Sequence, residues 1–484
     1  MPAKMSTSSK RALRRRTKIV ATIGPATGTA AMIERIVRAG VNVVRLNLSH
    51  GTHAQHLEYI EHIRNVSRRL NQRVAILVDL PGPKYRIGDI EGDGVRLKKG
   101  GVLGLTAEKV PGTASLVSVN IPRFVTDAKK GDTVLLDDGA LRLKVSRIDS
   151  GVVYCKVMVG GRLTSRRGLV VPGMHISGEF LNDSLLGHID FAVSVEADFV
   201  AISFVSSEED VLVVKNAFKE RGAEIPVISK IERGQAVRNF DSILAASDGV
   251  MVARGDLGVD IPLNRVPGVQ KEIIRLAKRA GKPVITATQM LESMIHSPSP
   301  TRAEVADVAN AIYDGTDATM LSTETSMGEY PVQAVRMMAG IAEVTEKKID
   351  YKRLLAESSN WLELKTDELI GYSACHIADT LGANAIVALT ESGSTALRVA
   401  KYRARMPIIA LSPREAVCRR LLLSWGVYPQ LIPNVTSVEF LFKTGGRLAK
   451  EMGVAKPGGV VVITGGIPVG VAGGTNLLKV ETIS

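Results

Sequence analysis

Polar and charged residues stand at the ends of most of the apolar, β-branched runs in this sequence. The run VNVVRLNL leads into SHG, VAILVD leads into LPGPKYRIG, and PVISKI leads into ERG. A single run of this kind commonly ends in an ordinary solvated turn, but repetition over successive runs indicates a shared site. The residues that could do chemistry there are Arg45, Asn47, Ser49, His50, Asp79, Lys84, Arg86, Ser203, Lys230, Glu232, Arg254, Gly255, Asp256, Thr288, Ser322 and Glu324.

The types of these residues favour a bound phosphate and a divalent metal. Glu232 and Asp256 could hold Mg²⁺, which takes one or two carboxylates together with substrate oxygens, and Mn²⁺ could replace it. Gly255 lets backbone N–H groups approach an anion closely. Phosphoryl transfer depends on positioning and charge, so it needs no protein nucleophile. Four cations suit a multiply charged phosphate better than a neutral substrate: Arg45, Lys84, Arg86 and Lys230.

An alternation of short apolar runs with helical stretches predicts the elements that position these residues. Eight runs alternate with stretches such as HLEYIEHIRNVSRRL and QKEIIRLAKRAG, and eight βα repeats close a (β/α)8 TIM barrel. The working residues of such a barrel come from the carboxyl ends of its strands. The runs lie at residues 18–23, 41–48, 74–79, 198–204, 226–231, 249–256, 283–288 and 317–322.

Two other modules interrupt and follow the barrel, which we expect at residues 17–87 and 179–345. Residues 88–178 are rich in Gly, Val and Leu in short alternating pieces, which predicts an inserted small β-barrel lid domain. The strands AIVALT, PIIALS and VVVITG alternate with helical stretches in residues 346–484, which predicts a C-terminal open-sheet α/β domain. Residues 1–16 are expected to form a basic flexible tail.

Composition and charge narrow the class of protein. The chain has 484 residues, of which 45% are hydrophobic and 23% charged, as is typical of a globular protein of several domains. Its three cysteines are far apart, and it has neither a membrane-length apolar run nor a secretory apolar segment. We therefore expect a cytoplasmic protein that engages no membrane. Seven of the cations behind the net charge of +13 lie in residues 1–18, which argues against a nucleic-acid surface.

Six motifs of the sequence resemble those of the pyruvate kinase family, in the family's order and across the whole chain. They are TKIVATIGPA, NVVRLNLSHGT, SKIER, VMVARGDLG, TATQMLESM and TRAEVADVANAIYDGTDATMLSTET. The resemblance implies a barrel, a lid and a C-terminal regulatory domain, assembled as a homotetramer. It implies transfer of the phosphoryl group of phosphoenolpyruvate to ADP, which gives pyruvate and ATP in the last step of glycolysis.

The resemblance also implies roles for individual residues. Arg45 and Lys230 would bind and stabilise the transferring phosphoryl group, and Thr288 would lie near the carbon that is protonated. The lid would close over the site and exclude water. The remaining implied contacts are Arg45, Gly255, Asp256 and Thr288 to the substrate, Glu232 and Asp256 to Mg²⁺, and Asn47, His50, Arg86 and Arg167 to the nucleotide.

Two positions depart from the family pattern. Arg167 stands where the family usually has a lysine that contacts the nucleotide, which keeps the charge and changes the geometry. The motif STETSMG has Met327 where the family often has a lysine. A proton relay through Ser322 and Glu324 is therefore less strongly implied.

Lys84 departs from the pattern in a way that predicts independence of K⁺. Many members of the family carry an acid there and bind K⁺ near the substrate phosphate. A tethered lysine ammonium supplies a monovalent charge in the same region. We therefore expect the enzyme to work without K⁺, with Lys84 opposite Asp79. The family's K⁺ ligands match Asn47, Ser49, Asp79 and the Leu80 carbonyl.

The segment TESGST at residues 390–395 is a Ser/Thr/Gly turn that leads into a helix. It is either a phosphate cradle or an ordinary capped helix start. In the family this loop binds the phosphate of an activator, and GGIPVGVAGGTN at residues 465–476 resembles the loop that closes over it. We expect a sugar-phosphate or nucleotide activator at Thr390, Ser392, Gly393, Ser394 and Thr395.

Two other functions stay open at this point. A catalytically silent protein with this fold could use its basic tail on RNA or acidic partners, although Lys230, Glu232, Asp256 and Thr288 are intact. A different phosphoenolpyruvate-handling barrel enzyme could phosphorylate a protein histidine. None of the eight histidines lies in a context that marks it as a phosphocarrier.

Overall fold

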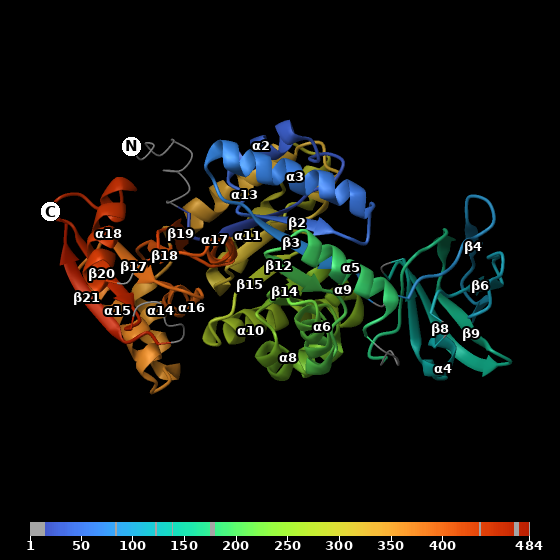
Figure 1. Ribbon diagram of the computed structural model, residues 1–484. Helices are drawn as coiled ribbons and strands as arrows, with labels where there is room; N and C mark the ends of the chain where they lie inside the picture. The colour runs from blue at the N-terminus through green and yellow to red at the C-terminus, as the bar shows by residue number, and fades with distance from the viewer. Residues whose placement is uncertain are drawn as a thin grey trace.

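Three bodies lie in a row in the structure, a computed structural model (Figure 1). The C-terminal domain is on the left, a closed barrel is in the centre and the lid is on the right. The expected architecture, a TIM barrel with an inserted β lid and a C-terminal α/β domain, is confirmed. Lys84 lies outside the described residues. The structure describes residues 15–82, 85–121, 123–137, 139–174, 180–434, 437–468 and 474–483.

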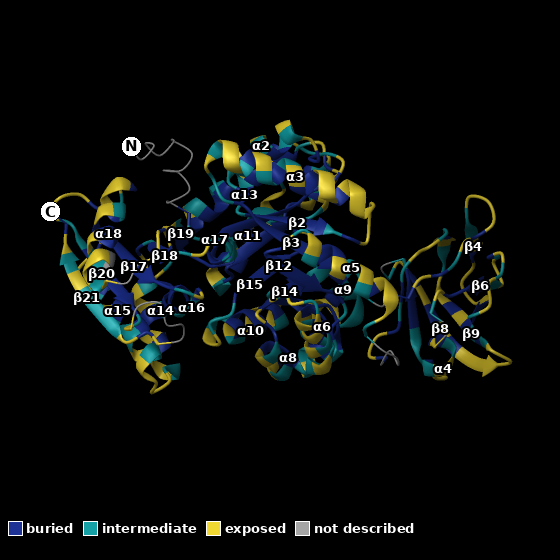
Figure 2. Ribbon diagram, in the orientation of Figure 1, coloured by how far each residue is buried: buried dark blue, intermediate teal, exposed yellow. Residues whose placement is uncertain are grey.

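Eight parallel strands close the central barrel in the order β1-β16-β15-β14-β13-β12-β3-β2. Nearly all of their side chains are buried (Figure 2), because helices cover the outside of the barrel and side chains fill its interior. Parallel pairing brings the carboxyl ends of all eight strands to one rim. The strands are β1 (Lys18–Thr22), β2 (Val43–Asn47), β3 (Ala75–Leu80), β12 (Phe199–Ile202), β13 (Val227–Ile231), β14 (Gly249–Ala253), β15 (Val284–Ala287) and β16 (Ala318–Leu321).

The helices around the barrel begin at well-defined caps. The side chains of Thr29, Thr52, Asn182 and Thr301 each accept a hydrogen bond from the backbone N–H three residues on. Among the described residues, none of the helices combines the length and apolar character that crossing a membrane requires. The helices are α2 (Ala30–Ala39), α3 (His53–Leu70), α5 (Asp183–Ser194), α6 (Glu208–Glu220), α7 (Gly234–Arg238), α8 (Phe240–Ala246), α10 (Val266–Arg279), α11 (Arg302–Asp314) and α13 (Pro331–Glu346), with short turns η1 (Leu263–Arg265) and η2 (Glu292–Ile295).

Two of the expected strand ends belong to short helices instead. The sixth run was predicted to extend to residue 256, but β14 ends at Ala253 and α9 (Arg254–Asp260) follows. The ψ of Ala253 is 81°, which already leaves the extended conformation. In the same way, β16 is followed by α12 (Thr323–Ser326). The prediction was wrong about these ends because the polar residues after each run continue as helical turns.

The lid has its own sheet and its own apolar core. Six strands pair in the order β11-β7-β8-β9-β5-β6, and β10 pairs with β4. All of these pairs are antiparallel except β5 with β6. Side chains alternate between buried and exposed at the start of β8, as a one-sided core requires. The elements are β4 (Val95–Leu97), β5 (Val102–Thr106), β6 (Leu116–Ser118), α4 (Phe124–Asp127), β7 (Thr133–Leu136), β8 (Leu141–Asp149), β9 (Val152–Val159), β10 (Gly161–Leu163) and β11 (Leu169–Val170).

The C-terminal domain is a five-stranded sheet in the order β19-β18-β17-β20-β21 with helices on it. The three inner strands are those expected from the sequence, and the two edge strands, β19 and β21, were not predicted. Only β21 runs antiparallel to its neighbour. The elements are α14 (Tyr351–Ser358), η3 (Ser359–Trp361), α15 (Thr366–Thr380), β17 (Ala385–Leu389), α16 (Ser394–Ala400), β18 (Ile408–Ser412), α17 (Glu415–Arg420), η4 (Leu421–Leu423), β19 (Val427–Leu431), α18 (Val438–Glu451), β20 (Val460–Gly465) and β21 (Leu477–Thr482).

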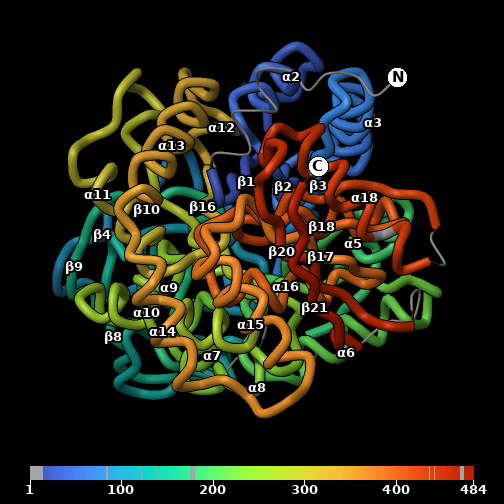
Figure 3. Tube along the Cα trace, turned by 90° about the vertical axis from the view of Figure 1, so that its left-hand side faces the viewer, coloured from blue at the N-terminus to red at the C-terminus, as the bar shows by residue number. Residues whose placement is uncertain are grey.

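The C-terminal domain covers the amino-terminal end of the barrel, opposite the rim (Figure 3). Leu422 and Leu423 of η4 join the apolar cluster that fills the barrel interior. Arg15 and Arg16, which the sequence placed in the flexible tail, are packed at this junction. Arg15 is only 4% exposed and donates a hydrogen bond to Asn42 Oδ1 at 2.6 Å. The domain therefore closes the barrel base, and the rim stays available for a ligand.

Candidate active site

Four charged side chains predicted from the sequence meet at the barrel rim. Arg45 lies in β2, Asp79 in β3 and Lys230 in β13, and Glu232 directly follows β13. Each is less than 10% exposed. The strands bring them together because Asn47 and Asp79 pair in register and β12 is the only strand between β3 and β13.

The four side chains form one chain of ion pairs. Arg45 Nε donates to Asp79 Oδ2 at 2.7 Å. Lys230 Nζ lies 3.3 Å from Asp79 Oδ1 and 2.9 Å from Glu232 Oε1. Two cations thus alternate with two acids at a buried position, where charges interact strongly because little water screens them.

The alternation shifts the pKa values of three groups. Burial alone would raise the pKa of Asp79, but the Lys230 ammonium and the Arg45 guanidinium outweigh it and hold that pKa below its usual value. Burial would lower the pKa of Lys230, but the carboxylates of Asp79 and Glu232 raise it above its usual value. Asp79 is therefore ionised and Lys230 protonated at neutral pH.

Glu232 has the opposite balance. Burial raises the pKa of Glu232, the Lys230 ammonium opposes that rise only in part, and the negative charge of Asp256 adds to it. Glu232 Oε2 accepts a hydrogen bond from the Phe204 backbone N–H at 2.7 Å. Glu232 Oε1 is buried, and its one close partner among the described residues is the Lys230 ammonium at 2.9 Å. A divalent cation on that oxygen would relieve both the burial of the carboxylate and its repulsion by Asp256.

The donor set fits magnesium rather than a metal that prefers nitrogen or sulfur. Asp256 lies in the first turn of α9. No group of three or more His, Cys, Asp or Glu ligands is found in the described ranges. Two carboxylates are what Mg²⁺ commonly takes from a protein when substrate oxygens and water complete its shell.

Two hydroxyl groups hold the charged side chains: that of Ser203, which was predicted from the sequence, and that of Thr22, which was not. Ser203 Oγ donates to the Leu80 carbonyl at 2.9 Å, and Lys230 Nζ donates to Ser203 Oγ at 2.7 Å. Arg45 Nη1 donates to Thr22 Oγ1 at 3.1 Å. Thr22 stands at the end of β1, and that position was the signal that could have identified it.

The loop after β15 forms a second part of the rim. The Gly255 backbone N–H donates to Thr288 Oγ1 at 2.8 Å, so the two predicted substrate contacts lie together. Thr288 has φ of 66°, a left-handed conformation that is costly for a β-branched residue. Arg254 holds this loop, because it donates to the Thr288 carbonyl at 2.7 Å and pairs with Asp307 at 2.6 Å.

The residues expected to contact a nucleotide divide between the rim and the lid. Arg86 and Arg167 lie on the lid side, where Arg86 Nη1 donates to the Arg166 carbonyl at 3.2 Å and Arg167 Nε donates to Thr164 Oγ1 at 2.7 Å. Both side chains belong to exposed residues. Asn47, Ser49 and His50 lie at and just beyond the end of β2, where Asn47 Oδ1 accepts from the Ser49 N–H at 3.2 Å.

The expected relay pair, Ser322 and Glu324, lies at the start of α12. Glu324 Oε2 accepts from the Ser322 N–H at 2.7 Å, and Oε1 accepts from the Leu291 N–H at 3.1 Å. Burial raises the pKa of Glu324. Ser322 Oγ is buried and has no hydrogen-bond partner among the described residues. The carboxylate therefore ties two loops together through backbone N–H groups.

The expected effector loop precedes α16 of the C-terminal domain. Gly393 has φ of 97°, and its N–H donates to Thr390 Oγ1 at 2.8 Å. Ser392 Oγ donates to Ser394 Oγ at 3.2 Å, and Thr395 Oγ1 lies 2.9 Å from Thr475 Oγ1. Residues 469–473 of the neighbouring Gly-rich loop lie outside the described residues.

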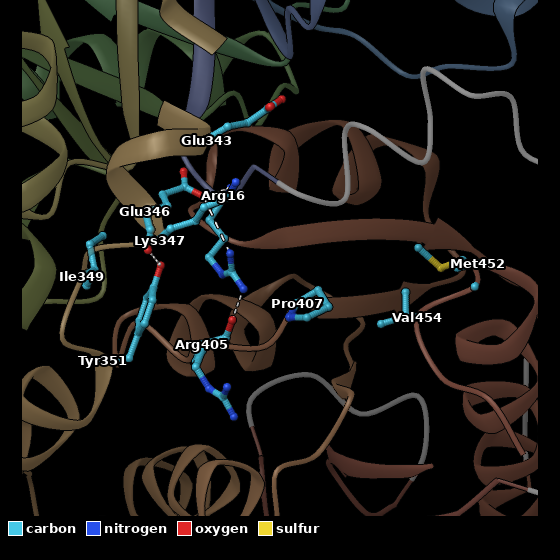
Figure 4. Close-up of a pocket in the computed structure, with 11 residues that line it drawn as sticks. Arg16, Glu343, Glu346, Lys347, Ile349, Tyr351, Arg405, Pro407, Met452 and Val454 are labelled. Atoms are coloured by element: carbon cyan, nitrogen blue, oxygen red, sulfur yellow. Dashed lines mark hydrogen bonds and ion pairs between the residues drawn. The ribbon is translucent and has the colours of Figure 1, made fainter. Parts of the chain in front are cut away.

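A cavity of about 850 Å³ lies far from this chemistry, at the junction of the barrel base and the C-terminal domain (Figure 4). Glu346 closes one side of it and accepts hydrogen bonds from the backbone N–H groups of Arg16 and Thr17 at 2.8 and 2.7 Å. Arg16 reaches across to the Arg405 carbonyl. Both oxygens of the Glu346 carboxylate therefore already bind the N-terminal segment.

Fold and rim together define the class of protein: a (β/α)8 barrel enzyme that binds an anionic substrate under a lid. Comparison with known proteins gives the particular family. The family model for the pyruvate kinase barrel domain matches residues 14–335, and the model for the pyruvate kinase alpha/beta domain matches residues 368–481. The chain belongs to the pyruvate kinase family and is a phosphotransferase whose substrates are phosphoenolpyruvate and ADP.

Individual relatives are similar over nearly the whole chain. A pyruvate kinase of Geobacillus stearothermophilus is 44% identical over 475 residues, which are 98% of this chain and 81% of the relative. One of Clostridium acetobutylicum is 42% identical over 97% of this chain and 99% of its own. The crystal structure of a pyruvate kinase from Cryptosporidium parvum superposes with a TM-score of 0.94 at 34% identity, covering 99% of this chain and 98% of that one.

Proposed function

We propose that the buried ion-pair chain at the rim is the phosphoryl-transfer centre of this pyruvate kinase. Arg45 and Lys230 bind the phosphoryl group of phosphoenolpyruvate and stabilise the charge on its oxygens during transfer. The observation that carries this assignment is the pair of buried cations held at one point by Asp79. Thr288 and the Gly255 N–H orient the carboxylate and enolate end of the substrate.

The glycine at position 255 supports this orientation of the substrate. The nearest atoms that a Cβ there would meet belong to Thr288, the closest at an ordinary contact distance of 3.5 Å, so the protein interior does not require glycine. A ligand that lies against the backbone would require it. We infer that the substrate lies against the first turn of α9.

Glu232 and Asp256 are proposed to hold Mg²⁺ or, in its place, Mn²⁺. When bound, the metal would neutralise negative charge on the transferring group. Lys230, by its contact with Glu232, favours the ionised form of that carboxylate and stays in reach of the phosphoryl group. Ser322 and Glu324 are proposed to position the loop beside Thr288 during enolate protonation.

A lactate-dehydrogenase-coupled assay tests the central assignment. Lys230→Met should lower kcat by about 10²- to 10³-fold, the effect of removing one stabilising group from a transition state. Lys215→Met, which removes a lysine paired with Asp248 on the outer surface, is the control and should leave kcat unchanged. Near-normal turnover of Lys230→Met would contradict the assignment.

We propose that the enzyme needs no K⁺ because a lysine, Lys84, supplies the charge. Three of the four groups that would bind K⁺ already have partners: Asp79 is paired with two cations, Asn47 Oδ1 accepts from the Ser49 N–H, and the Leu80 carbonyl accepts from Ser203. Turnover should be equal in K⁺ and in a tetraalkylammonium salt. Lys84→Glu should lose activity without K⁺ and regain it with K⁺, and strong K⁺ activation of the unaltered chain would refute the proposal.

The nucleotide contacts proposed are Asn47, His50, Arg86 and Arg167. Because Arg86 and Arg167 are both held by the lid segment at residues 164–168, ADP would bridge the rim and the lid. Arg86→Met should raise KM for ADP more than KM for phosphoenolpyruvate. An equal rise for both substrates would place Arg86 elsewhere.

We also propose a phosphorylated activator at the loop before α16 and a homotetrameric assembly, both by analogy with the family. Light scattering of the purified chain measures the assembly directly. Fructose bisphosphate, ribose 5-phosphate, glucose 6-phosphate and AMP should be tried at subsaturating phosphoenolpyruvate. Ser394→Asp, which adds a negative charge to the loop, should abolish the response to whichever compound activates.

A further inference from the structure

Two histidines from different helices face each other beside the rim. His53 is the first residue of α3, and His188 lies in the middle of α5. His53 Nε2 lies 2.8 Å from His188 Nδ1, and the two ring centroids are 5.0 Å apart at an interplanar angle of 73°. The two helices are neighbours in the outer layer (Figure 1), because α3 leads into β3 and α5 leads into the adjacent β12.

The imidazole of His53 is held in place although it is exposed. It stacks on Phe191, one turn along α5 from His188, with ring centroids 4.4 Å apart and the planes at 14°. Thr52 caps α3 and fixes where His53 stands. One helix therefore supplies both the surface that orients the His53 ring and the imidazole that meets it, so the pair is preorganised.

Neither facing nitrogen is engaged by any other group in the part of the chain that the structure describes. His53 is exposed and His188 is half-buried. Throughout the described ranges, the only hydrogen-bond partner of either facing nitrogen is the other one. The neutral form of an imidazole is the form that binds a metal.

The separation suits one metal ion between the two nitrogens. Imidazole nitrogens bind zinc at about 2.0–2.1 Å, so two of them on one tetrahedral ion stand about 3.3 Å apart. The observed separation of 2.8 Å is about 0.5 Å shorter than this value, so the rings must rotate until both nitrogens face one ion. Neutral imidazole suits Zn²⁺, Ni²⁺ and Cu²⁺, whereas Mg²⁺ requires oxygen ligands.

We propose that His53 and His188 form a second metal site, selective for a divalent transition metal and separate from the magnesium site of the reaction. The two imidazoles are its protein ligands, and water completes the shell, since no third protein ligand is grouped with them in the described residues. The bound ion would replace the proton shared by the two rings. It would link α3, which follows the rim loop containing His50, to α5, the first helix after the lid.

Titration calorimetry of ZnCl₂ into the full chain at pH 7.5, with Mg²⁺ saturating, tests the proposal. The unaltered chain should bind zinc at one site per chain that both His53→Gln and His188→Gln weaken. Loss of an outer-shell partner of a metal ligand typically costs about 10- to 100-fold in affinity, and loss of a direct ligand should cost no less. The double variant should be no worse than either single variant, because one ligand alone cannot chelate.

A matched control separates this pair from any exposed histidine. His296 is also exposed, but its Nδ1 lies 3.0 Å from a carboxylate oxygen of Glu329 instead of a second imidazole. His296→Gln should leave zinc affinity at the parent value. Activity with Mg²⁺ alone and the thermal unfolding midpoint without zinc establish that each variant is folded.

Electron paramagnetic resonance of one equivalent of Cu²⁺ gives an independent measurement. The parent spectrum should show coupling to two imidazole nitrogens, and each single variant should show at most one. The proposal is overturned if the parent chain does not bind zinc in the presence of Mg²⁺. It is equally overturned if His53→Gln and His188→Gln bind like the parent, or if His296→Gln weakens binding as much as they do.

Discussion

Asp79 is the side chain on which the geometry of the rim depends, and Asp79→Asn is the substitution that tests it. The carboxylate is 1% exposed and touches both proposed phosphoryl-binding cations, Arg45 at 2.7 Å and Lys230 at 3.3 Å. Asparagine has nearly the same shape and can still accept a hydrogen bond, but it carries no charge. The substitution therefore leaves two buried cations with one acid, Glu232, which contacts Lys230 and not Arg45.

The expected loss of stability follows from this change. Removing one partner of a buried ion pair costs about 3–5 kcal/mol, because the remaining charge is left uncompensated. At about 2 cal/mol/K per residue, unfolding all 484 residues together carries an entropy of about 1 kcal/mol/K. The unfolding midpoint should therefore fall by about 3–5 °C. Because the pKa of Asp79 is lowered in the folded protein, this contribution is present at neutral pH and disappears only as the pH falls below the usual aspartate pKa.

Activity should fall far more than the loss of stability explains. Arg45 loses its acid partner and Lys230 loses one of two, so both cations move from the positions in which they meet the phosphoryl group. A displacement of about 1 Å costs about 10²-fold in rate, and we expect a loss of that size in kcat/KM, measured by the coupled assay well below the unfolding midpoint.

Asp198→Asn is the matched control. Asp198 is also 1% exposed and also meets two cations, Arg419 at 2.6 Å and Arg64 at 3.3 Å, but it lies at the barrel base. It should lower the unfolding midpoint by a similar amount and leave kcat/KM unchanged. The reasoning fails if Asp79→Asn keeps kcat/KM within about threefold of the parent, well short of the expected loss, or if Asp198→Asn loses as much activity.

Three further predictions concern the base and the rim. Burial lowers the pKa of Lys18 to about 7, so the folded protein binds fewer protons than the unfolded chain between pH 7 and the usual lysine pKa. The free energy of unfolding should therefore rise over this range, by at most about 1.4 kcal/mol per pH unit. Denaturant unfolding of Lys18→Met should show no such rise. Leu423→Ala should lower the free energy of unfolding by about 2–5 kcal/mol and leave kcat unchanged, because the side chain is fully buried in the barrel interior. Arg254→Lys cannot hold several carbonyls of the Thr288 loop at once, so kcat/KM for phosphoenolpyruvate should fall by about 10²-fold; an unchanged value would show that the loop needs no such support.

Much of the rim could be predicted from the sequence because, in a barrel of parallel strands, the position of a residue along its own strand is enough to place it at the rim. In a barrel, a polar residue at the end of a strand comes to the same rim as every other such residue, so Arg45, Asp79, Lys230 and Glu232 are found without knowledge of which strands are neighbours. Their actual partners depend on that knowledge. The contact of Lys230 with Ser203 joins residues from two strands and could not be read from the sequence.

The parts of the fold that were missed have physical reasons. The strand β19 contains Pro429, which lacks a backbone N–H and reads as a break, yet an edge strand accommodates it. The strand β21 is the other edge, and its mixed LLKVET sequence shows little of the apolar run that marks an inner strand. Arg254 and Asp256 were assigned to a strand because apolar residues lead directly into them, but α9 begins at Arg254.

Buried charge alone does not distinguish the rim from the barrel base. The number of partners that each buried carboxylate oxygen has does distinguish them. At the base, Asp317 accepts from Arg403 through both oxygens, at 2.9 and 3.0 Å, and also from the backbone N–H groups of Trp425 and Val284. All the lone pairs of the Asp317 carboxylate accept hydrogen bonds from the protein, so none is left for a ligand. At the rim, each oxygen of Glu232 meets a single partner in the described residues, the Phe204 N–H or the Lys230 ammonium, and burial raises the pKa of the carboxylate. The unused lone pairs of this buried carboxylate can bind a cation, so the incomplete pairing of Glu232, rather than its burial, distinguishes the rim that we propose as the site of the chemistry.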